Sequence, residues 1–446
     1  MAERLVVIGG DAAGMSAASQ ARRRQRHLDI VVLEKGHFTS YSACGIPYLV
    51  SGEIKEVDDL VARTPEEFRE RQLIDVRMGH EAMSVDLDAG KVEVRDHHRD
   101  RNLAVSFDQV LFANGARPIR PDLPGIDSDW VRGVQTLDDA ADLLKVAERS
   151  ECRDVVVVGG GYIGLEMAEA FKERGARVVV VEGADQLLSG LDPDMAELVA
   201  NDVKAFGVEV RLGEKVEGFA DGRVHTAHGT LTADVAILGL GVSPNAELAT
   251  GAGVSPGAHG AVAVDRRQRT DVDGAWAAGD CATSHHRVTN RQVHVALGTV
   301  ANKQGRVAGI NLGGGYASFP GVVGTAITRV GRTEIARTGV NEKEAAAAGY
   351  DVVASRIEST TYAGYLPDAP AMTVKLLAEK VTERLLGVQI VGGAGAAKRI
   401  DTAAAAITAG LSAGDMVDLD LAYAPPFSSV WDPLQVAARD ALRLLG

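Results

Sequence analysis

A single cysteine stands in the stretch TSYSACGIPYLVSGE, which consists largely of small and turn-forming residues. This residue, Cys44, follows Glu34 by ten positions and lies where a short helix is expected to begin. Backbone N–H groups at a helix start stabilise a thiolate, and the neighbouring Gly45 and Pro47 predict a turn instead of a packed core. Free cysteines usually pack as small hydrophobic residues, but these features predict that Cys44 is a redox-active thiol.

The other two cysteines of the chain, Cys152 and Cys281, are far from Cys44 in the sequence. A dithiol reductase needs a Cys-x2-Cys or Cys-x4-Cys pair, and this sequence has none. A lone thiol can instead cycle as a mixed disulfide with a sulfur from the substrate, or through a sulfenic acid formed by peroxide. We expect Cys152 and Cys281 to be packing residues. So few cysteines exclude a disulfide scaffold and indicate a reduced, cytoplasmic protein.

The elements expected around Cys44 include a strand–turn–helix unit of the kind that binds dinucleotides. In RLVVIGGDAAGMSAASQARRR, a buried strand over 4–8 runs into Gly9 and Gly14, the first and last glycines of the dinucleotide fingerprint. The middle glycine position holds Asp11, which departs from that pattern. The next strand, DIVVLEK, ends at Glu34, whose carboxylate is placed to accept a hydrogen bond from a ribose hydroxyl.

A second unit, DVVVVGGGYIGLEMAEAFKERGARVVVVEGA, matches the whole fingerprint. Its glycines, Gly159, Gly161 and Gly164, allow a tight turn and a close approach of the backbone to a pyrophosphate at the helix N-terminus. The following strand ends at Glu182, whose charge would repel a 2′-phosphate on the ribose. Arg177 is the arginine that could fold near this position.

Three further strands run into small residues, namely FDQVLFANGARP, ADVAILGLGVSPN and TDVDGAWAAGDCA. With the two glycine turns, and in this order from Arg4 to Cys281, they resemble the signature set of the two-dinucleotide-binding flavoproteins. The resemblance implies that the first fold binds FAD, that the second binds NAD(P)H, and that Asp280 contacts the ribityl chain of FAD. With Glu182 in place, NADH is the favoured nucleotide.

The resemblance also implies an α/β fold with two Rossmann-like domains and a C-terminal α+β dimerisation domain. We expect a discontinuous FAD domain over 1–117 and 247–324, an NAD(P)H domain over 118–246 and a dimerisation domain over 325–446. The C-terminal part alternates the strands MTVKLLAE and LLGVQIVGG with the alanine-rich segment KRIDTAAAAITAG. A third, independent domain is the alternative interpretation of this part.

The turn with Cys44 resembles the single-cysteine branch of the flavoprotein disulfide reductases. That branch includes coenzyme A-disulfide reductases, NADH oxidases, NADH peroxidases and persulfide reductases. Its peroxidases and water-forming oxidases carry a histidine in the first glycine loop, where this chain has Ala12. The resemblance therefore favours coenzyme A-disulfide reduction, and it implies a coenzyme A site made of Ser16, Gln20, Arg23, Ser40 and Asn302. A solvated basic face on ARRRQR is the alternative for part of this set.

Two tyrosines of the C-terminal part, Tyr365 and Tyr423, match catalytic tyrosines that reach the partner's active site in the reductases. The chain departs from the family pattern at four further positions, which are Ala43, Gln72, Leu366 and Phe427. By resemblance, the cofactor contacts come from the glycine turns, the strand ends and the C-terminal part: Gly9, Gly10, Ala13, Gly14, Glu34, Lys35, Ala82, Ala113, Asn114, Gly115, Gly159, Gly161, Tyr162, Ile163, Gly164, Glu166, Glu182, Gly241, Gly279, Asp280, Ala296, Leu297, Thr299 and Phe427.

Composition excludes several other classes of protein. The net charge of −14 argues against binding to nucleic acid or to anionic membranes. The chain is 46% apolar and 24% charged, and no apolar run reaches membrane-spanning length. No metal site is predicted.

We therefore predict a homodimeric enzyme that passes hydride from NAD(P)H through FAD to Cys44, which reduces coenzyme A disulfide or a persulfide. The alternatives are an NAD(P)H oxidase that uses oxygen or peroxide, a reductase that passes electrons to a ferredoxin, and a flavoprotein that senses NADH without catalysis. Ferredoxin-type reductases lack a cysteine in this turn and have a different C-terminal domain, so they are the weaker match.

Overall fold

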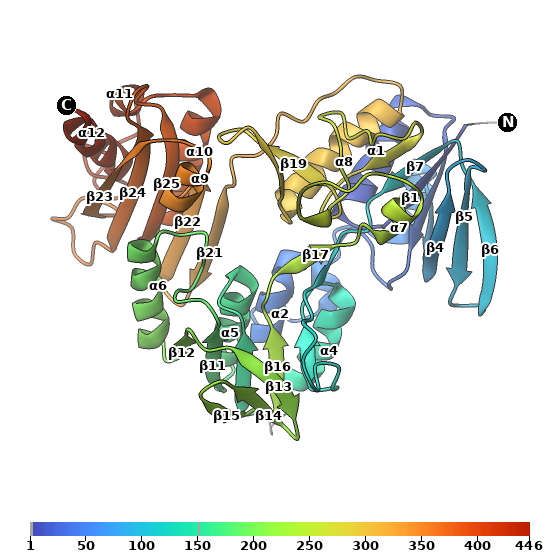
Figure 1. The fold of residues 1–446 in the computed structure, drawn as a ribbon, viewed down its shortest axis with the longest axis horizontal. Helices are drawn as coiled ribbons and strands as arrows, with labels where there is room; N and C mark the ends of the chain where they lie inside the picture. Colours follow the sequence, from blue (N-terminus) through green and yellow to red (C-terminus); the bar gives the residue numbers. More distant parts are fainter. Residues whose placement is uncertain (1–2, 150–151) are drawn as a thin grey trace.

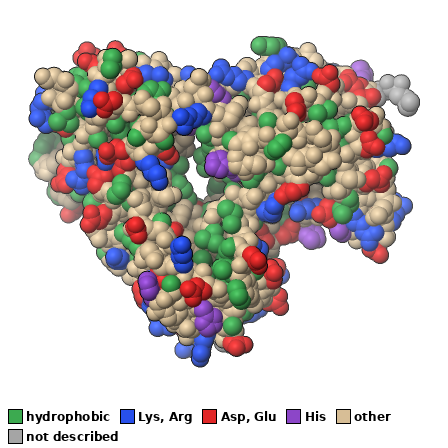
Figure 2. All heavy atoms as spheres, viewed as in Figure 1, with side chains coloured by type: hydrophobic (Ala, Val, Ile, Leu, Met, Phe, Trp, Pro, Cys, Tyr) green, Lys and Arg blue, Asp and Glu red, His purple; other side chains and the backbone are tan. Residues whose placement is uncertain are grey.

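The computed structural model describes residues 3–149 and 152–446. The chain forms three lobes, with the N-terminal fold at the right of Figure 1, the second fold at the bottom and the C-terminal unit at the left. Figure 2 shows a gap between the lobes, and acidic and basic side chains are interspersed over the visible face. None of the helices in the described ranges is long and apolar enough to cross a membrane.

The first fold is built on a parallel sheet of five strands in the order β18-β7-β1-β2-β3. Because β18 comes from far along the chain and pairs with β7, this unit contains two separate segments of the sequence. Helices α1 and α8 pack closely, since a Cβ on Gly305 or Gly309 would overlap the backbone of Ala13 or Ala17. The elements are β1 (Arg4–Ile8), α1 (Ala12–Arg24), β2 (Asp29–Glu34), α2 (Ile46–Ser51), α3 (Pro65–Gln72), β3 (Asp75–Met78), β7 (Gln109–Phe112), β18 (Ala275–Ala277) and α8 (Gly298–Leu312).

The second fold repeats this arrangement, with five parallel strands in the order β12-β11-β10-β16-β9. Each fold also carries a three-stranded antiparallel sheet, β4-β5-β6 in the first and β13-β14-β15 in the second. The elements are β9 (Val131–Gly133), α4 (Leu137–Ala147), β10 (Asp154–Val158), α5 (Tyr162–Glu173), β11 (Arg177–Glu182), α6 (Pro193–Ala205), β12 (Glu209–Leu212) and β16 (Val235–Leu238), with the antiparallel strands β4 (His80–Asp86), β5 (Lys91–Asp96), β6 (Arg101–Ser106), β13 (Val216–Ala220), β14 (Arg223–Thr226) and β15 (Gly229–Thr232).

The chain leaves and re-enters the first fold through a two-stranded antiparallel ribbon of β8 (Ala116–Pro118) and β17 (Val242–Pro244). The predicted boundaries at residues 117 and 246 lie in or beside this ribbon, and we retain them as a proposal. Beyond the ribbon follow α7 (Glu247–Gly251) and the hairpin of β19 (Thr283–His286) and β20 (Arg291–His294).

The C-terminal unit is an antiparallel sheet in the order β21-β22-β25-β24-β23. Helix α12 packs on β23 and β24 and buries Leu434, Ala437, Ala438 and Ala441, which follow helical spacing. The elements are β21 (Ala326–Val330), β22 (Thr333–Gly339), α9 (Glu342–Ala347), β23 (Val352–Thr360), β24 (Ala371–Glu379), β25 (Leu385–Gly392), α10 (Ile400–Ala409), α11 (Ala413–Val417) and α12 (Pro433–Leu445).

Candidate active site

The first glycine turn has the close backbone packing that a dinucleotide site requires. Gly9 has a φ of 107°, and a Cβ there would overlap the carbonyl oxygen of Ala113. A Cβ on Gly14 would in turn overlap the carbonyl oxygen of Gly9. Asp11, which replaces the middle glycine, accepts a hydrogen bond from the backbone N–H of Tyr41 at 3.1 Å. The departure from the fingerprint therefore connects the turn to the segment that carries Cys44.

The carboxylate at the end of β2 is held by the backbone on both of its oxygens. Glu34 Oε2 accepts from the N–H of Gly10 at 2.7 Å, and Oε1 accepts from the N–H of Gly36 at 2.7 Å. Burial raises the pKa of this carboxyl group. Lys35 is exposed and borders a hollow of about 590 Å³, and Ala82 is half-buried on β4. These predicted cofactor contacts thus lie around one end of the first sheet.

Two acceptor atoms near the other strand ends are buried and unpaired among the described residues. Asp280 Oδ1 and Asn114 Oδ1 have no hydrogen-bond partner among the described residues. Burial raises the pKa of Asp280 to about 6. Gly279, with a φ of 83°, is held by Gln304, whose Oε1 accepts from its N–H at 2.8 Å. Unpaired buried acceptors are costly unless a ligand supplies donors, and a hydroxyl-bearing ribityl chain would supply them.

The position of Cys44 is set by packing against the second fold. Cys44 lies in a short 3-10 turn over Ala43–Gly45, and its side chain is exposed. Helix α2 follows directly, and its residues Ile46 and Leu49 belong to the same buried cluster as Phe171 of α5. The thiol is therefore carried by the first fold and fixed against the second.

The predicted stabilisation of the Cys44 thiolate by a backbone N–H group is present, but other effects on its pKa outweigh it. Partial burial raises the pKa of Cys44, and the carboxylates of Glu166 and Asp280 raise it further. The backbone N–H of Cys44 acts in the opposite direction but does not prevail. Burial is the larger cause and the two carboxylates add to it, and neither burial nor the charge of a distant part of the chain can be read from local sequence.

Elements of all three lobes meet near Cys44. Glu166, on α5, accepts a hydrogen bond from Thr328 Oγ1 on β21 at 2.7 Å, and burial raises the pKa of Glu166. The hydroxyl of Tyr162, one turn earlier on α5, is buried without a partner among the described residues. Both side chains were predicted to contact the nucleotide, and the structure brings them to the face of α5 that is near the thiol and the C-terminal unit.

The second glycine turn reproduces the first in detail. Gly159 has a φ of 105°, and a Cβ on Gly164 would overlap its carbonyl oxygen. Glu182 Oε2 accepts from the N–H of Gly160 at 2.7 Å, and Oε1 accepts from the N–H of Ala184 at 2.8 Å. The remaining predicted cofactor contacts of this fold lie at two places. Gly161 and Ile163 flank the start of α5, and Gly241 follows the end of β16.

Of two basic residues in the second fold, Arg177 and Lys215, only Lys215 lies near the expected ribose end. Arg177 begins β11 whereas Glu182 ends it, and Arg177 pairs with Asp154 Oδ1 at 2.7 Å, so it does not approach Glu182. Sequence reasoning missed Lys215, which follows β12. Its side chain lies beside Gly183, because a Cβ on that glycine would be 3.5 Å from Lys215 Cγ. Only the pairing of β12 with β11 brings these residues together.

The predicted coenzyme A residues are partly assembled by the packing of α1 on α8. Ser16 Oγ donates to Asn302 Oδ1 at 2.8 Å, although 286 residues separate them. Gln20 is half-buried and Arg23 is exposed one turn further along α1, and Ser40 is half-buried beside the first glycine turn. The nearby predicted cofactor residues Ala296, Leu297 and Thr299 lie just before α8 and at its start.

The predicted catalytic tyrosines lie on two adjoining loops of the C-terminal unit. A side-chain hydrogen bond to Tyr423 raises the pKa of Tyr365. Arg399 holds the loops together, because it donates to the carbonyl oxygens of Thr361 and Phe427 and pairs with Asp432 Oδ2 at 3.0 Å. Several large side chains of these loops are exposed: Tyr365 (73%), Tyr423 (47%), Phe427 (76%), Val430 (68%) and Trp431 (46%).

Two dinucleotide-binding folds, the second inserted in the first, a thiol between them and an antiparallel C-terminal sheet define an oxidoreductase of the flavoprotein disulfide reductase type. Comparison with known families agrees. The chain belongs to the pyridine nucleotide-disulphide oxidoreductase family, whose model matches residues 3–305, and the dimerisation domain of that family matches residues 325–434. Members typically carry FAD, and the chain is an NAD(P)H-dependent flavoprotein oxidoreductase. The predicted family and fold class are confirmed.

Individual relatives are similar over nearly the whole chain. The NAD(P)H coenzyme A polysulfide/persulfide reductase of Pyrococcus horikoshii is 40% identical, covering 98% of this chain and 98% of that protein. An NADH oxidase of Methanocaldococcus jannaschii is 36% identical, covering 99% of each chain. Among solved structures, the NAD-dependent persulfide reductase from A. fulgidus has a TM-score of 0.96 and 38% identity, over 99% of this chain and 83% of that one.

Proposed function

We propose that this enzyme uses Cys44 as its single redox thiol to reduce a low-molecular-weight disulfide or persulfide with electrons from NAD(P)H. The observation that carries the proposal is the position of Cys44. Its thiol is exposed and free, it lies between the two dinucleotide-binding folds, and carboxylates of both folds influence its pKa. Neither other cysteine suits this role, because Cys281 is fully buried and Cys152 precedes β10 in the second fold.

The first fold would hold FAD through the Gly9–Gly14 turn, Glu34 and the unpaired oxygen of Asp280. The second fold would hold NAD(P)H through the Gly159–Gly164 turn. When bound, FAD supplies a hydride acceptor that can return an electron pair to sulfur.

The thiol chemistry follows from the lone cysteine. The Cys44 thiolate attacks one sulfur of the substrate, so that a new S–S bond forms while the substrate S–S bond breaks and one thiol leaves with a proton. Two electrons from NAD(P)H and a second proton then cleave the mixed disulfide and release the second thiol. Because the pKa of Cys44 is raised, thiolate formation requires a proton acceptor, and the nearby carboxylate of Glu166 is suited to this role.

Coenzyme A is the substrate carrier that the first helix would accommodate. Ser16 and Asn302 form a polar pair, and Gln20 and Arg23 continue along α1, where they could contact phosphate groups. The curated relative from Pyrococcus horikoshii is named for coenzyme A and for polysulfide or persulfide, which supports this class of acceptor.

The enzyme would work as a homodimer in which Tyr365 and Tyr423 of one subunit serve the thiol of the other. Their exposure on loops of the dimerisation domain supports this arrangement. A phenol close to the mixed disulfide could protonate the departing thiolate. Oxygen is a second candidate acceptor, because one close relative is named an NADH oxidase.

A direct comparison of acceptors tests this proposal. NADH consumption by the purified, FAD-loaded enzyme should be measured with coenzyme A disulfide, polysulfide, hydrogen peroxide and air-saturated buffer. We expect the sulfur acceptors to support the largest kcat/KM. Equal or faster turnover with oxygen alone would contradict the proposal and favour the oxidase.

A further inference from the structure

A short segment, residues 187–192, connects the second glycine turn to the C-terminal unit. At its start, Leu188 has a φ of 46° and its N–H donates to the carbonyl oxygen of Gly160 at 2.9 Å. The Leu187 side chain lies directly on Gly160, where a Cβ would overlap it. The start of the segment therefore forms part of the support of the glycine turn.

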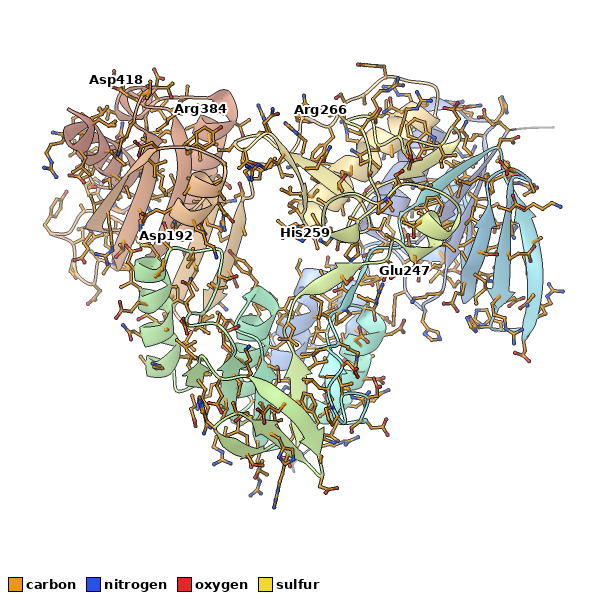
Figure 3. The ribbon with its side chains drawn as sticks, viewed as in Figure 1. Asp192, Glu247, His259, Arg266, Arg384 and Asp418 are labelled. Carbon is orange, nitrogen blue, oxygen red and sulfur yellow. The ribbon has the colours of Figure 1, made fainter. Side chains whose placement is uncertain are left out.

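The end of this segment is held by four side chains of the C-terminal unit, which we call the clasp: Arg337, Asn341, Lys375 and Gln389. Arg337 and Asn341 both donate to the carbonyl oxygen of Gly190. Gln389 Oε1 accepts from the N–H of Asp192 at 2.7 Å, and its Nε2 donates to Asp192 Oδ2 at 2.6 Å. Figure 3 places Asp192 near the start of α6, where the second fold meets the C-terminal sheet.

Lys375 provides the charge at the centre of the clasp. Its side chain is buried, and its Nζ lies 3.3 Å from Asp192 Oδ2 and 2.7 Å from Asp194 Oδ1, with Glu342 as a third partner. These three carboxylates are close enough to hold a metal ion, but the lysine ammonium supplies the positive charge there. Because the ammonium and Asp192 are both buried, the pair is screened little by solvent and its geometry is well defined.

The clasp also reaches the predicted nicotinamide end of the site. Burial raises the pKa of the Tyr162 phenol. Arg337 lies close enough for its charge to oppose part of this increase. The Tyr162 hydroxyl is buried without a partner among the described residues. One arginine of the C-terminal unit thus neighbours both the supporting segment and the side chain at the start of α5.

We infer that the clasp positions the second glycine turn, so that the dimerisation domain sets the affinity of the enzyme for its pyridine nucleotide. Backbone N–H groups bind a pyrophosphate tightly only if they are already held in place. The clasp keeps the segment on Gly160 and thereby keeps the turn ready for the nucleotide. Lys375 and Gln389 are positioning residues, since they act through Asp192 and contact no nucleotide. The inference rests on the proposed function only in taking the second fold as the pyridine-nucleotide site.

The test compares clasp variants with a matched control in the FAD-loaded, full-length enzyme. Gln389→Leu and Lys375→Met remove clasp contacts, whereas Asp192→Asn retains the shape of the side chain and removes only its charge. Lys380→Met is the control, because Lys380 forms an exposed pair with Asp351 at 2.8 Å in the same domain. NAD⁺ is titrated into the oxidised enzyme by calorimetry, and KM and kcat for NADH are measured separately.

We expect the Kd for NAD⁺ and the KM for NADH to rise roughly fivefold to twentyfold in the clasp variants, the size typical of coupling between sites. The kcat at saturating NADH, the FAD content and the values for Lys380→Met should stay close to those of the parent. An unchanged Kd in folded, FAD-loaded variants would overturn the inference. So would a parallel loss of FAD and NAD⁺ binding in all three variants, because it would indicate a general structural role. The NAD⁺ titration does not need an electron acceptor, so failure of the proposed disulfide reduction would leave it interpretable.

Discussion

Cys44 and Asp192 occupy corresponding positions in the two dinucleotide-binding folds. Each follows by ten residues the carboxylate that ends the second strand of its fold, Glu34 for Cys44 and Glu182 for Asp192. The repeated fold therefore presents one position twice, once as an exposed thiol and once as a buried carboxylate held by the C-terminal unit.

The backbone before these two residues is also repeated. Four residues earlier, Ser40 and Leu188 have φ values of 50° and 46°. Their N–H groups donate to the carbonyl oxygens of Gly10 at 3.2 Å and of Gly160 at 2.9 Å. The same turn thus directs the chain away from each glycine loop, toward an exposed thiol in the first fold and toward a contact with the C-terminal unit in the second.

Replacing the thiol should remove sulfur chemistry and leave the cofactor sites intact. We expect Cys44→Ser to lower the rate of disulfide or persulfide reduction by roughly 10³-fold or more, because no other cysteine can form the mixed disulfide. FAD content and NADH-dependent reduction of an artificial quinone should persist. Cys152→Ser is the matched control, and disulfide turnover in Cys44→Ser equal to that of this control would refute the mechanism.

Restoring a phenol on the exposed loops should accelerate turnover. Phe427 follows the loop of Tyr423 and is 76% exposed, so Phe427→Tyr places a second proton donor on the same surface. If that surface faces the partner's thiol, the rate of disulfide reduction should rise severalfold. Val430→Tyr, at an exposed position in the same segment, should change little. Equal effects of both substitutions would argue against the shared site. Point variants are preferable to truncation, because α12 covers the C-terminal sheet.

Nucleotide preference offers a separate prediction. Lys215 lies beside Gly183, next to the carboxylate that is expected to contact the ribose. We expect Lys215→Met to lower kcat/KM for NADPH more than for NADH, since a lysine near this position attracts a 2′-phosphate that Glu182 repels. The exposed Lys204 on α6 serves as the control in Lys204→Met. Identical losses with both nucleotides would show that Lys215 does not contact the phosphate.

Stability should depend on pH through Glu169, a buried residue of α5. Burial raises the pKa of Glu169 to about 7, well above its ordinary value of 4.5. The carboxyl group of Glu169 has a higher pKa in the folded protein than in the unfolded chain. Its protonation therefore stabilises the folded state fully below about pH 4.5, and this stabilisation is lost as the pH rises through about 7. Its size is at most roughly 3 kcal/mol.

In the parent protein, Glu169 Oε1 accepts a hydrogen bond from the N–H of Gly331 at 2.8 Å. A glutamine at this position would retain that acceptor oxygen. We therefore expect Glu169→Gln to raise the melting temperature relative to the parent at pH 8 and to have little effect at pH 5. Glu173→Gln, at the exposed end of the same helix, is the control. A difference that is constant across pH would contradict the assigned pKa.

The local units of this protein follow from patterns in its sequence. Short runs of apolar residues that end in Gly9 or Gly159 predict buried parallel strands followed by turns, because a Cβ at these glycines would collide with the backbone of a neighbouring strand. The carboxylates at the ends of β2 and β11 follow from the same spacing. Such features depend on residues close in the chain, so composition and spacing are enough to place them.

The environment of those units depends on how the three lobes pack together. Burial raises the pKa of Cys44, and Glu166 and Asp280, which arrive from distant segments, raise it further, so that the effect of the helix start is outweighed. Lys215 and Gly183 are neighbours because β12 pairs with β11. The clasp joins Asp192 to Gln389 across 197 residues. Burial and Coulomb interactions depend on distances in space, and the order of residues along the chain does not specify those distances until the lobes have packed together.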